Sequence, residues 1–319
     1  MSRMNSYPTL SLLLAISASA LPSLGSSLDN TGIVLRDHHI TAIIRPDWGG
    51  RIMSICADGT NNLLWVNQQV ETLMWGWRNY GGDKTWIGPQ ESWKPTTGLN
   101  WPPPLSFDYL PFTVTTQTVN TVSMRSAIDT NWNFAVERTV RIDQGKILVT
   151  SSLVSPEPEA KHPDGRMTSW AVAQIPLSPR VWVRMINSKR YHNGFLDSPK
   201  LPDPQPLGTN KDCLLFDLTG LGSNGKCFFD ADAFLVEVPG GYLSIVQTDC
   251  DYLGDGTNGI PERAQFFVGS RKDLPPEYEA YMEIEFAMPY PKSRQTITYS
   301  FIPHDHPDNP EELVGLLVP

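Results

Sequence analysis

The fifteen residues "AFLVEVPGGYLSIVQ", Ala233 to Gln247, predict the fold class of this chain. Two runs rich in β-branched and aromatic residues flank Pro239, Gly240 and Gly241. Such runs favour extended strands, and a Pro-Gly-Gly segment between them is typical of a tight turn. The stretch therefore predicts a β-hairpin.

Similar runs recur along most of the chain, bounded by Gly, Pro, Asn or Asp, and they predict an all-β protein of about fifteen short strands. So many strands suit a large two-sheet sandwich, and no repeat of about 40 to 50 residues indicates a propeller. A helix is expected only in the C-terminal tail, where Asp308 and Asn309 can cap "EELVGLL". The runs are "GIVLRDHHITAIIRP" (32–46), "FTVTTQTVNTVSMRSAI" (112–128), "NFAVERTVRID" (133–143), "KILVTSSLVSP" (146–156), "VWVRMI" (181–186), "AQFFVGS" (264–270), "YMEIEFAMPYP" (281–291) and "QTITYSFIPH" (295–304).

Composition and charge limit the functional classes. The 319 residues are 40% hydrophobic and 18% charged, so the chain can bury a large core. The formal charge of −9 and the scarcity of Lys/Arg clusters argue against binding to a phosphate backbone. Nucleic acid is therefore not an expected partner.

The first twenty residues have the pattern of a secretory signal. Arg3 precedes the apolar run 10–16, and Ala18-Ser19-Ala20 has the small-x-small form of a signal peptidase site. A short membrane anchor is the alternative, but the run is too short to span a bilayer. We expect residues 1–20 to be a signal peptide, residues 21–319 to form one β-sandwich domain, and the mature protein to be secreted or periplasmic without a membrane segment.

Export makes the four cysteines candidates for disulfide bonds. Cys213 and Cys227 flank a glycine-rich segment that can turn back, and we expect them to pair with each other. No Cys/His spacing indicates zinc, and Asp249, Asp251 and Asp255 lack the regular ligand pattern of a Ca²⁺ loop. The sequence thus predicts no metal and no cofactor.

Two segments interrupt the strand pattern, 76–104 and 191–210, and both are expected to be long loops. The first contains "NYGGDKTWIGPQESW" (79–93), with Trp75, Trp77 and Trp101 close by. Flat aromatic faces with hydrogen-bonding groups at their edges match the apolar face and hydroxyl rim of a sugar. The alternative is a tryptophan-rich loop that closes one end of the sandwich, with Asp83 and Lys84 as a local ion pair.

The same block, with "GGRIMSICADGTNNLLWVN" before it and "WPPPLSFDYLPFTV" after it, resembles a family of mostly bacterial exported proteins of unknown function. That family lies within the galactose mutarotase-like superfamily. The resemblance extends through "ERTVRI", "SWAVAQIPLSP" and "YMEIEFAMPYP". It implies a galactose mutarotase-like β-supersandwich, here with one short C-terminal helix, that binds ligands on the concave side of a sheet.

Aldose epimerases of that superfamily use a Glu as general base and a His as general acid to open and reclose a sugar ring. Glu283 and Glu285 lie two residues apart on one expected strand and face the same side, and we favour Glu283. No histidine has the epimerase sequence context. His192, in the proline-rich segment, is the favoured acid, and Asp83 or Lys84 is the substitute.

Further side chains are expected to contact the sugar. Trp170 and Gln174 share one side of a strand, whereas Arg138 could hold a sugar carboxylate or pair with a core acid. Three classes of function stay open: an epimerase-like, lyase or hydrolase enzyme acting on carbohydrate, a non-catalytic carbohydrate-binding protein, or a structural β-protein. The expected substrate-binding residues are Asn79, Trp86, Gln90, Arg138, Trp170 and Gln174.

Overall fold

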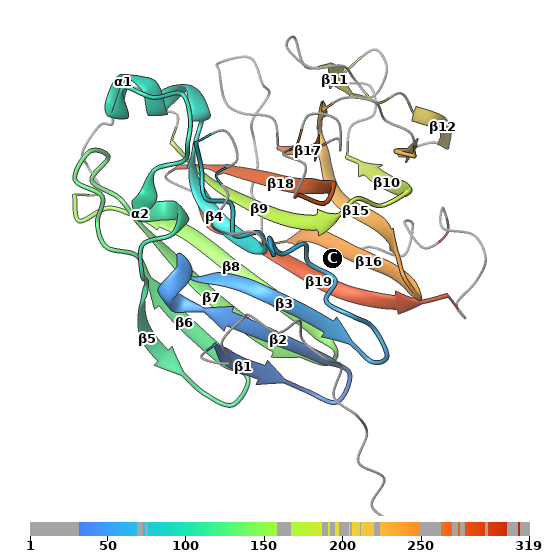
Figure 1. The fold of residues 1–319 in the computed structure, drawn as a ribbon, viewed down its shortest axis with the longest axis horizontal. Coiled ribbons are helices and arrows are strands. Elements are labelled where there is room, and N and C mark those ends of the chain that lie inside the picture. Colours follow the sequence, from blue (N-terminus) through green and yellow to red (C-terminus); the bar gives the residue numbers. More distant parts are fainter. Residues whose placement is uncertain are drawn as a thin grey trace, which may run out of the picture.

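The computed structural model describes two large antiparallel sheets packed face to face (Figure 1). The all-β prediction is confirmed. Phe216 of one sheet packs against Phe266 of the other with ring centroids 5.0 Å apart, so the core lies between the sheets. The residues described are 32–68, 73, 76–157, 167–186, 191, 195–197, 204, 206–210, 212–219, 224–248, 263–269, 274, 278–290, 293–304 and 312.

The first sheet has nine strands and contains both the N-terminal strands and the segment 83–88. Every neighbouring pair in it is antiparallel. In spatial order its strands are β1 (Ile33–Arg36), β2 (Ile40–Arg45), β3 (Arg51–Ala57), β4 (Asp83–Gly88), β9 (Thr168–Pro176), β18 (Tyr281–Pro289), β17 (Ala264–Gly269), β14 (Gly225–Phe229) and β11 (Leu196–Asp197).

The second sheet has ten strands and includes the predicted hairpin. Residues 233–247 form it as expected: β15 pairs with β16, and Gly240 turns between them with a φ of +84°. In spatial order the strands are β12 (Pro206–Asn210), β13 (Cys213–Asp217), β10 (Arg180–Met185), β15 (Ala231–Val238), β16 (Gly241–Thr248), β19 (Gln295–Pro303), β8 (Lys146–Val154), β7 (Ala135–Asp143), β6 (Thr121–Arg125) and β5 (Thr113–Gln117).

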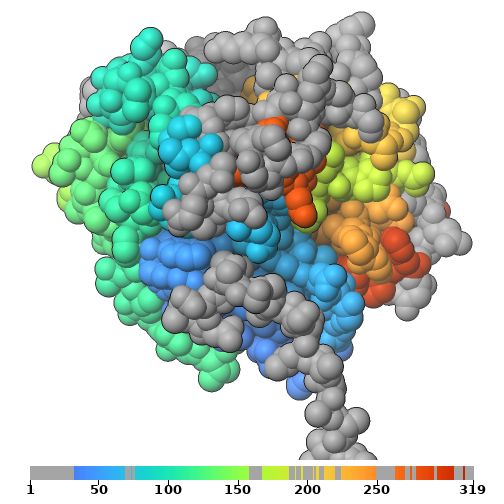
Figure 2. Space-filling view, viewed as in Figure 1, coloured from blue at the N-terminus to red at the C-terminus, as the bar shows by residue number. Residues whose placement is uncertain are grey.

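Helices are short and lie near one end of β4 (Figure 1). Within the described residues they are α1 (Trp93–Thr97) and α2 (Leu105–Asp108), with the single 3₁₀ turns η1 (Pro46–Trp48) and η2 (Gln90–Ser92). In Figure 2 this region occupies the upper left of the molecule, above β1 to β3. The expectation that only the tail is helical is therefore wrong. The C-terminal helix itself falls outside the described residues except for Glu312, which is helical.

The segment expected to be a loop contains a strand. Asp83–Gly88 is β4, which pairs with β9 along its whole length and is buried at all six positions. The turn before it requires glycine: Gly81 has a φ of +84°, and a Cβ there would lie 2.4 Å from the Trp65 carbonyl oxygen. The twin glycines thus let two chain segments approach closely and direct the chain into the sheet.

The expected pairing of Cys213 with Cys227 is wrong. Cys213 begins β13 in the ten-stranded sheet, whereas Cys227 lies on β14 in the nine-stranded sheet, and no disulfide joins them. The chain between them crosses from one sheet to the other instead of turning back as a hairpin. The Cys227 Sγ lies 3.8 Å from the Pro204 carbonyl oxygen.

Several expectations concern residues outside the described ranges: the signal peptide 1–20, His192, and Asp249, Asp251 and Asp255. Within the described ranges, no helix has the length and apolar character needed to cross a membrane.

Candidate functional site

A cavity of about 430 Å³ lies on the nine-stranded sheet, on the face turned away from the ten-stranded sheet. Strand alternation explains the facing, because Met282, Ile284 and Phe286 enter the core while the two glutamates between them point the other way. The cavity has the size of an ordinary small-molecule site. It is lined by Trp86, Gln90, Trp101, Trp170, Lys226, Phe267, Tyr281, Glu283 and Glu285.

Strand register assembles this site from distant parts of the sequence. Gln174 on β9 lies opposite Glu283 on β18, which lies opposite Phe267 on β17. Phe267 in turn pairs with Lys226 on β14. Four strands therefore place one side chain each in a row across the sheet.

Glu285 is held rigidly at the cavity. Its carboxylate accepts hydrogen bonds from the Trp170 indole at 2.7 Å and from the Gln265 amide, and it forms an ion pair with Lys226 at 3.3 Å. The residue is fully buried. Because three donors already occupy its oxygens, Glu285 suits a structural role in positioning Trp170 and Lys226.

Glu283 has a different environment. Its Oε1 accepts a hydrogen bond of 2.7 Å from the Gln174 amide, the one hydrogen-bond donor to this carboxylate among the described residues, and the residue is 8% exposed and lines the cavity. Burial, followed by repulsion from Glu285, raises the pKa of Glu283 to about 7, while Lys84, Lys226 and the Gln174 hydrogen bond act in the opposite direction. A carboxyl group with this pKa can both accept and release a proton near neutral pH.

Lys84 lies behind the cavity wall. Its side chain extends from β4 and is fully buried, with Nζ 4.9 Å from the centre of the Trp86 ring and 5.8 Å from that of Trp77. Burial, followed by repulsion from Arg51, lowers the pKa of Lys84 to about 7, whereas Glu283, Asp108 and Asp83 act to raise it. The buried amine has no hydrogen-bond partner among the described residues.

Five tryptophans form a continuous wall beside these groups. Trp86 is central: its ring centroid lies 5.4 Å from Trp170, 6.0 Å from Trp101 and 6.1 Å from Trp93. Trp77 meets Trp86 edge to face at 5.7 Å. The Trp101 indole nitrogen is buried without a hydrogen-bond partner among the described residues, so it offers a donor beside the cavity.

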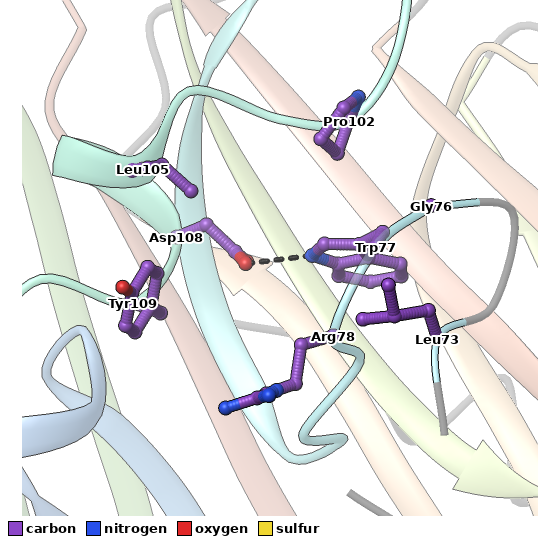
Figure 3. Close-up of a pocket in the computed structure, with 8 residues that line it drawn as sticks. All are labelled: Leu73, Gly76, Trp77, Arg78, Pro102, Leu105, Asp108 and Tyr109. Atoms are coloured by element: carbon purple, nitrogen blue, oxygen red, sulfur yellow. Dashed lines mark hydrogen bonds between the residues drawn. The ribbon is translucent and has the colours of Figure 1, made fainter. Parts of the chain in front are cut away.

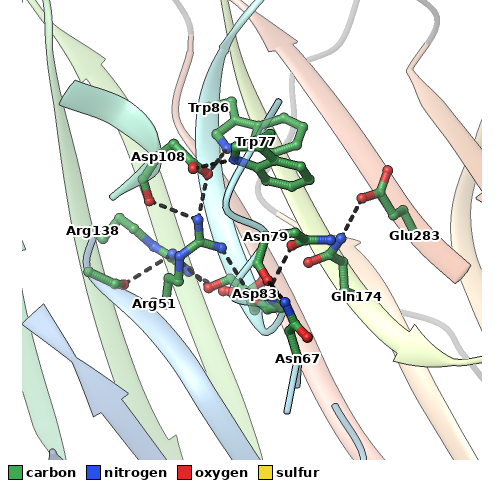
Figure 4. Close-up of polar contacts among 12 residues, drawn as sticks. Arg51, Asn67, Trp77, Asn79, Asp83, Trp86, Asp108, Arg138, Gln174 and Glu283 are labelled. Carbon is green, nitrogen blue, oxygen red and sulfur yellow. Dashed lines mark hydrogen bonds and ion pairs between the residues drawn. The ribbon is translucent and has the colours of Figure 1, made fainter. Parts of the chain in front are cut away.

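Asp108 on α2 fixes the orientation of this wall (Figure 4). Its carboxylate accepts hydrogen bonds from the Trp77 indole at 2.7 Å and the Trp86 indole at 2.8 Å, and it pairs with the buried Arg51. Arg51 also donates to the Gly81 carbonyl oxygen at 2.9 Å, which ties the glycine turn to α2. No local pattern indicates the contact between Arg51 and Asp108, since the two residues are 57 positions apart.

A second cavity, of about 290 Å³, lies beside Trp77 and α2 (Figure 3). Leu73 and Leu105 on its rim are more than half exposed, and the Trp77 indole points toward Asp108 across it. Its lining is mostly apolar and lacks the glutamates of the first cavity. Its residues are Leu73, Gly76, Trp77, Arg78, Pro102, Leu105, Asp108 and Tyr109.

Three expected site residues lie away from the main cavity. Asp83 faces the core, where it pairs with Arg138 of β7 and accepts a hydrogen bond of 2.6 Å from Tyr299. Neither Asp83 nor Arg138 is more than 1% exposed, so Arg138 takes the second of its two expected roles and pairs with a core acid. Asp83 pairs with Arg138, not with Lys84 as a local ion pair. Asn79 is fully buried, and its side chain accepts a hydrogen bond of 3.0 Å from the Gly81 amide as part of the glycine turn.

Five other expected residues lie at the main cavity, whereas Lys84 lies behind its wall. Trp86, Gln90, Trp170 and Glu283 line it, and Gln174 supports Glu283 from below. Figure 4 shows the Gln174 amide pointing at the Glu283 carboxylate. His192 lies outside the described residues.

Lys226, Phe267 and Tyr281 are lining residues that the sequence reasoning missed. Burial raises the pKa of Tyr281 well above its ordinary value, so its phenol remains a hydrogen-bond donor. Lys226 and Phe267 lie in "GKCFF" and "AQFFVG", and alternation within a strand does not indicate which face carries the site. Among the described residues, no three His, Cys, Asp or Glu side chains come together as a metal site.

Comparison with known proteins identifies the fold. No family model and no curated protein sequence matches the chain. Its structure is similar to a candidate aldose 1-epimerase from Escherichia coli K12, with a TM-score of 0.54 and 14% identity over 86% of this chain and 99% of that chain. It is also similar to a TPR-domain containing protein from Parabacteroides distasonis, with a TM-score of 0.52 and 15% identity over 89% of this chain and 48% of that one. The fold is thus the galactose mutarotase-like β-sandwich that the sequence resemblance implied.

Proposed function

We propose that the protein binds a sugar in the tryptophan-walled cavity and catalyses an aldose epimerase-like proton transfer with Glu283. The observation that carries this proposal is the Glu283 carboxyl group: it lines a cavity, accepts a hydrogen bond from Gln174, and has a pKa raised to about 7. The fold similarity to a candidate aldose 1-epimerase supports it.

The cavity wall suits a pyranose ring. Trp86, Trp101 and Trp170 provide aromatic surface against which the C–H face of a sugar can pack. Gln90 and Lys226 provide polar groups at the edge of that surface, where sugar hydroxyls would lie. A ligand with an apolar face and a polar rim matches both features.

In this reaction the Glu283 carboxylate takes the proton from the anomeric hydroxyl of the sugar. The bond between the anomeric carbon and the ring oxygen then breaks, and the ring oxygen receives a proton from an acid. Return of both protons after rotation of the aldehyde group gives the other anomer. Lys226 lines the cavity, and its ammonium group can act as the acid that donates a proton to the ring oxygen.

Hydrolysis fits this site less well. A glycoside hydrolase needs two carboxyl groups that are free to act on one bond. Here the Glu285 carboxylate already accepts hydrogen bonds from Trp170 and Gln265 and pairs with Lys226, and these contacts favour its charged, immobile form over a role as a second acid or base.

Polarimetry tests the proposal. Fresh α-glucose and α-galactose should approach their equilibrium rotation faster with the protein than in buffer, and Glu283→Gln should reduce the enzymatic rate at least a hundredfold. Glu137→Gln, on the solvent side of β7, is the matched control and should leave the rate unchanged. Tryptophan fluorescence should still report sugar binding by Glu283→Gln. Binding by the parent protein without any rate enhancement would instead indicate a non-catalytic carbohydrate-binding protein.

We also propose that the protein is exported. Arg3, the apolar run 10–16 and the small residues Ala18-Ser19-Ala20 together have the pattern of a signal peptide. Expression of the full chain in a bacterial host should yield a mature protein that begins at Leu21. Intact-mass measurement of the cell fractions would show this, and an uncleaved chain retained in the cytoplasm would contradict it.

A further inference from the structure

The two cavities share one wall of tryptophan rings. Trp77 lines the second cavity, and its ring centroid lies 5.0 Å from that of Trp101 and 5.7 Å from that of Trp86, which both line the main cavity. Trp101 is followed directly by Pro102, which lines the second cavity. One layer of rings therefore separates the two cavities.

Asp108 fixes this layer from the side of the second cavity. It lines that cavity, and its carboxylate accepts hydrogen bonds from the indole of Trp77 at 2.7 Å and from that of Trp86 at 2.8 Å. One carboxylate thus orients a ring of each cavity. Figure 4 shows Asp108 on one side of these two rings and Glu283 on the other. Direct hydrogen bonds therefore hold the two cavities in a fixed arrangement.

The second cavity has the surface features of a sugar subsite. Its volume of about 290 Å³ is close to the lower limit of small-molecule pockets, so it suits one small unit of a ligand. Tyr109 is 37% exposed, and its ring is stacked on that of Tyr80 with centroids 6.3 Å apart. Arg78 is exposed and brings guanidinium donors to the same cavity (Figure 3). A supported aromatic ring with donors nearby matches the apolar face and the hydroxyl groups of a pyranose.

The rim between the cavities offers a path for a chain. Trp101 and Pro102 are partly exposed, whereas Trp77 and Trp86 are buried. A ligand that passes over Trp101 and Pro102 would contact exposed surface and would leave the ring layer in place. On the far side of this rim, Leu105 is 51% exposed and adds apolar surface to the second cavity.

We propose that the sugar bound by this protein is an oligosaccharide. Its reducing-end unit lies in the main cavity, and the units that follow pass over Trp101 and Pro102 into the second cavity. The inference rests on the proposed function, because only the reducing-end unit of a glycan has the free anomeric hydroxyl from which Glu283 takes a proton. The other units must leave the main cavity, and the second cavity provides the adjoining aromatic and polar surface.

Isothermal titration calorimetry with glucose, galactose, cellotetraose, maltotetraose and galactotetraose tests the proposal. At least one tetrasaccharide should bind about tenfold more tightly than its own monosaccharide, because it contacts both cavities. Tetrasaccharides that bind no more tightly than the monosaccharides would overturn the proposal. The absence of binding by all of these sugars would also overturn it.

Variants of the second cavity locate the added affinity. Tyr109→Ala removes the aromatic ring and should lower the ratio of tetrasaccharide to monosaccharide affinity about fivefold. Leu105→Trp, an exposed change that narrows the cavity, should lower the same ratio and keeps the test decisive if Tyr109→Ala does not fold. Leu99→Trp is the matched control, because Leu99 is 55% exposed and lines neither cavity, and the ratio should not change. A ratio that Tyr109→Ala and Leu105→Trp leave unchanged would contradict the proposal.

Saturation-transfer difference NMR shows which sugar units contact the protein. In the parent protein, both the reducing-end unit and the inner units of the bound tetrasaccharide should receive saturation. In Tyr109→Ala the inner units should lose more of it than the reducing-end unit. Equal losses at all units would mean that the second cavity does not hold the chain.

Polarimetry separates this inference from the proposed function. If the protein accelerates mutarotation of monosaccharides but prefers no tetrasaccharide, the proposed function stands and the inference fails. If it prefers a tetrasaccharide through Tyr109 but mutarotates no sugar, the proposed catalysis fails and the oligosaccharide site stands.

Discussion

Asp83 and Lys84 are consecutive in the chain, yet they lie on opposite faces of the nine-stranded sheet. Asp83 faces the core and pairs with Arg138 of the ten-stranded sheet. Lys84 faces the cavity side and packs against Trp86. One dipeptide thus contributes an ion pair between the sheets and a buried amine behind the candidate site.

Replacing Asp83 should destabilise the fold. Asp83→Ala leaves Arg138 buried without its acid and removes the acceptor of the Tyr299 hydroxyl. Loss of one partner from a buried pair costs about 3–5 kcal/mol, so the urea midpoint should fall markedly. Glu137→Ala is the control, because Glu137 precedes Arg138 on β7 but pairs with Arg125 near solvent. It should change the free energy of unfolding by less than about 1 kcal/mol. An Asp83→Ala protein as stable as Glu137→Ala would contradict this role.

The glycine turn before β4 gives a second stability prediction. Gly81→Ala would place a Cβ 2.4 Å from the Trp65 carbonyl oxygen at a φ of +84°, so both strain and a backbone clash oppose it. Gly59→Ala is the matched control, because its φ is +74° but nothing lies within 4 Å of the added Cβ. Gly59→Ala should cost about 1 kcal/mol and Gly81→Ala at least twice that, measured by thermal and urea unfolding. Equal costs for the two variants would show that the close approach at Gly81 is unimportant.

The sequence predicted what depends on local pattern. Alternation placed Glu283 and Glu285 on one face of a strand, and Trp170 and Gln174 on one face of another, because side chains in a strand alternate with a period of two. The same local signal located the 233–247 hairpin. Both site pairs lie on the cavity side of the nine-stranded sheet.

What the sequence could not predict depends on strand order and on burial of both faces. β4 reads as a loop because "DKTWIG" is buried on both sides and therefore shows no polar alternation. Lys226 reaches Glu285 only because β14 lies beside β17, and β17 beside β18. Likewise, Asp83 and Arg138 meet across the two sheets from positions 55 residues apart.

Lys226 should be necessary for turnover. Its ammonium group lines the cavity and pairs with Glu285 at 3.3 Å, so Lys226→Met removes both a candidate proton donor and the counter-charge of a buried carboxylate. We expect kcat for mutarotation to fall at least tenfold. Lys146→Met, an exposed change on β8, serves as the control. Unchanged kinetics in Lys226→Met would assign the acid role to another residue.

The raised pKa of Glu283 should appear in the pH dependence of stability. A carboxyl group whose pKa rises from 4.5 in the unfolded chain to about 7 in the folded protein binds more protons when folded between those values. Its contribution to stability is therefore fully present below pH 4.5 and is lost as the pH rises through about 7. At roughly 1.4 kcal/mol per pH unit, the loss is about 3 kcal/mol at most.

Glu283→Gln should remove this decline, because the amide does not titrate. The free energy of unfolding should be measured by urea for the parent protein and for Glu283→Gln from pH 4.5 to 8. As the pH increases, it should fall in the parent protein but not in the variant, so that the difference between them grows. Glu137→Gln, whose side chain is about half exposed, should retain the decline of the parent protein. A Glu283→Gln curve parallel to that of the parent would mean that Glu283 ionises normally in the folded state, and it would remove the main support for its proposed role in acid-base catalysis.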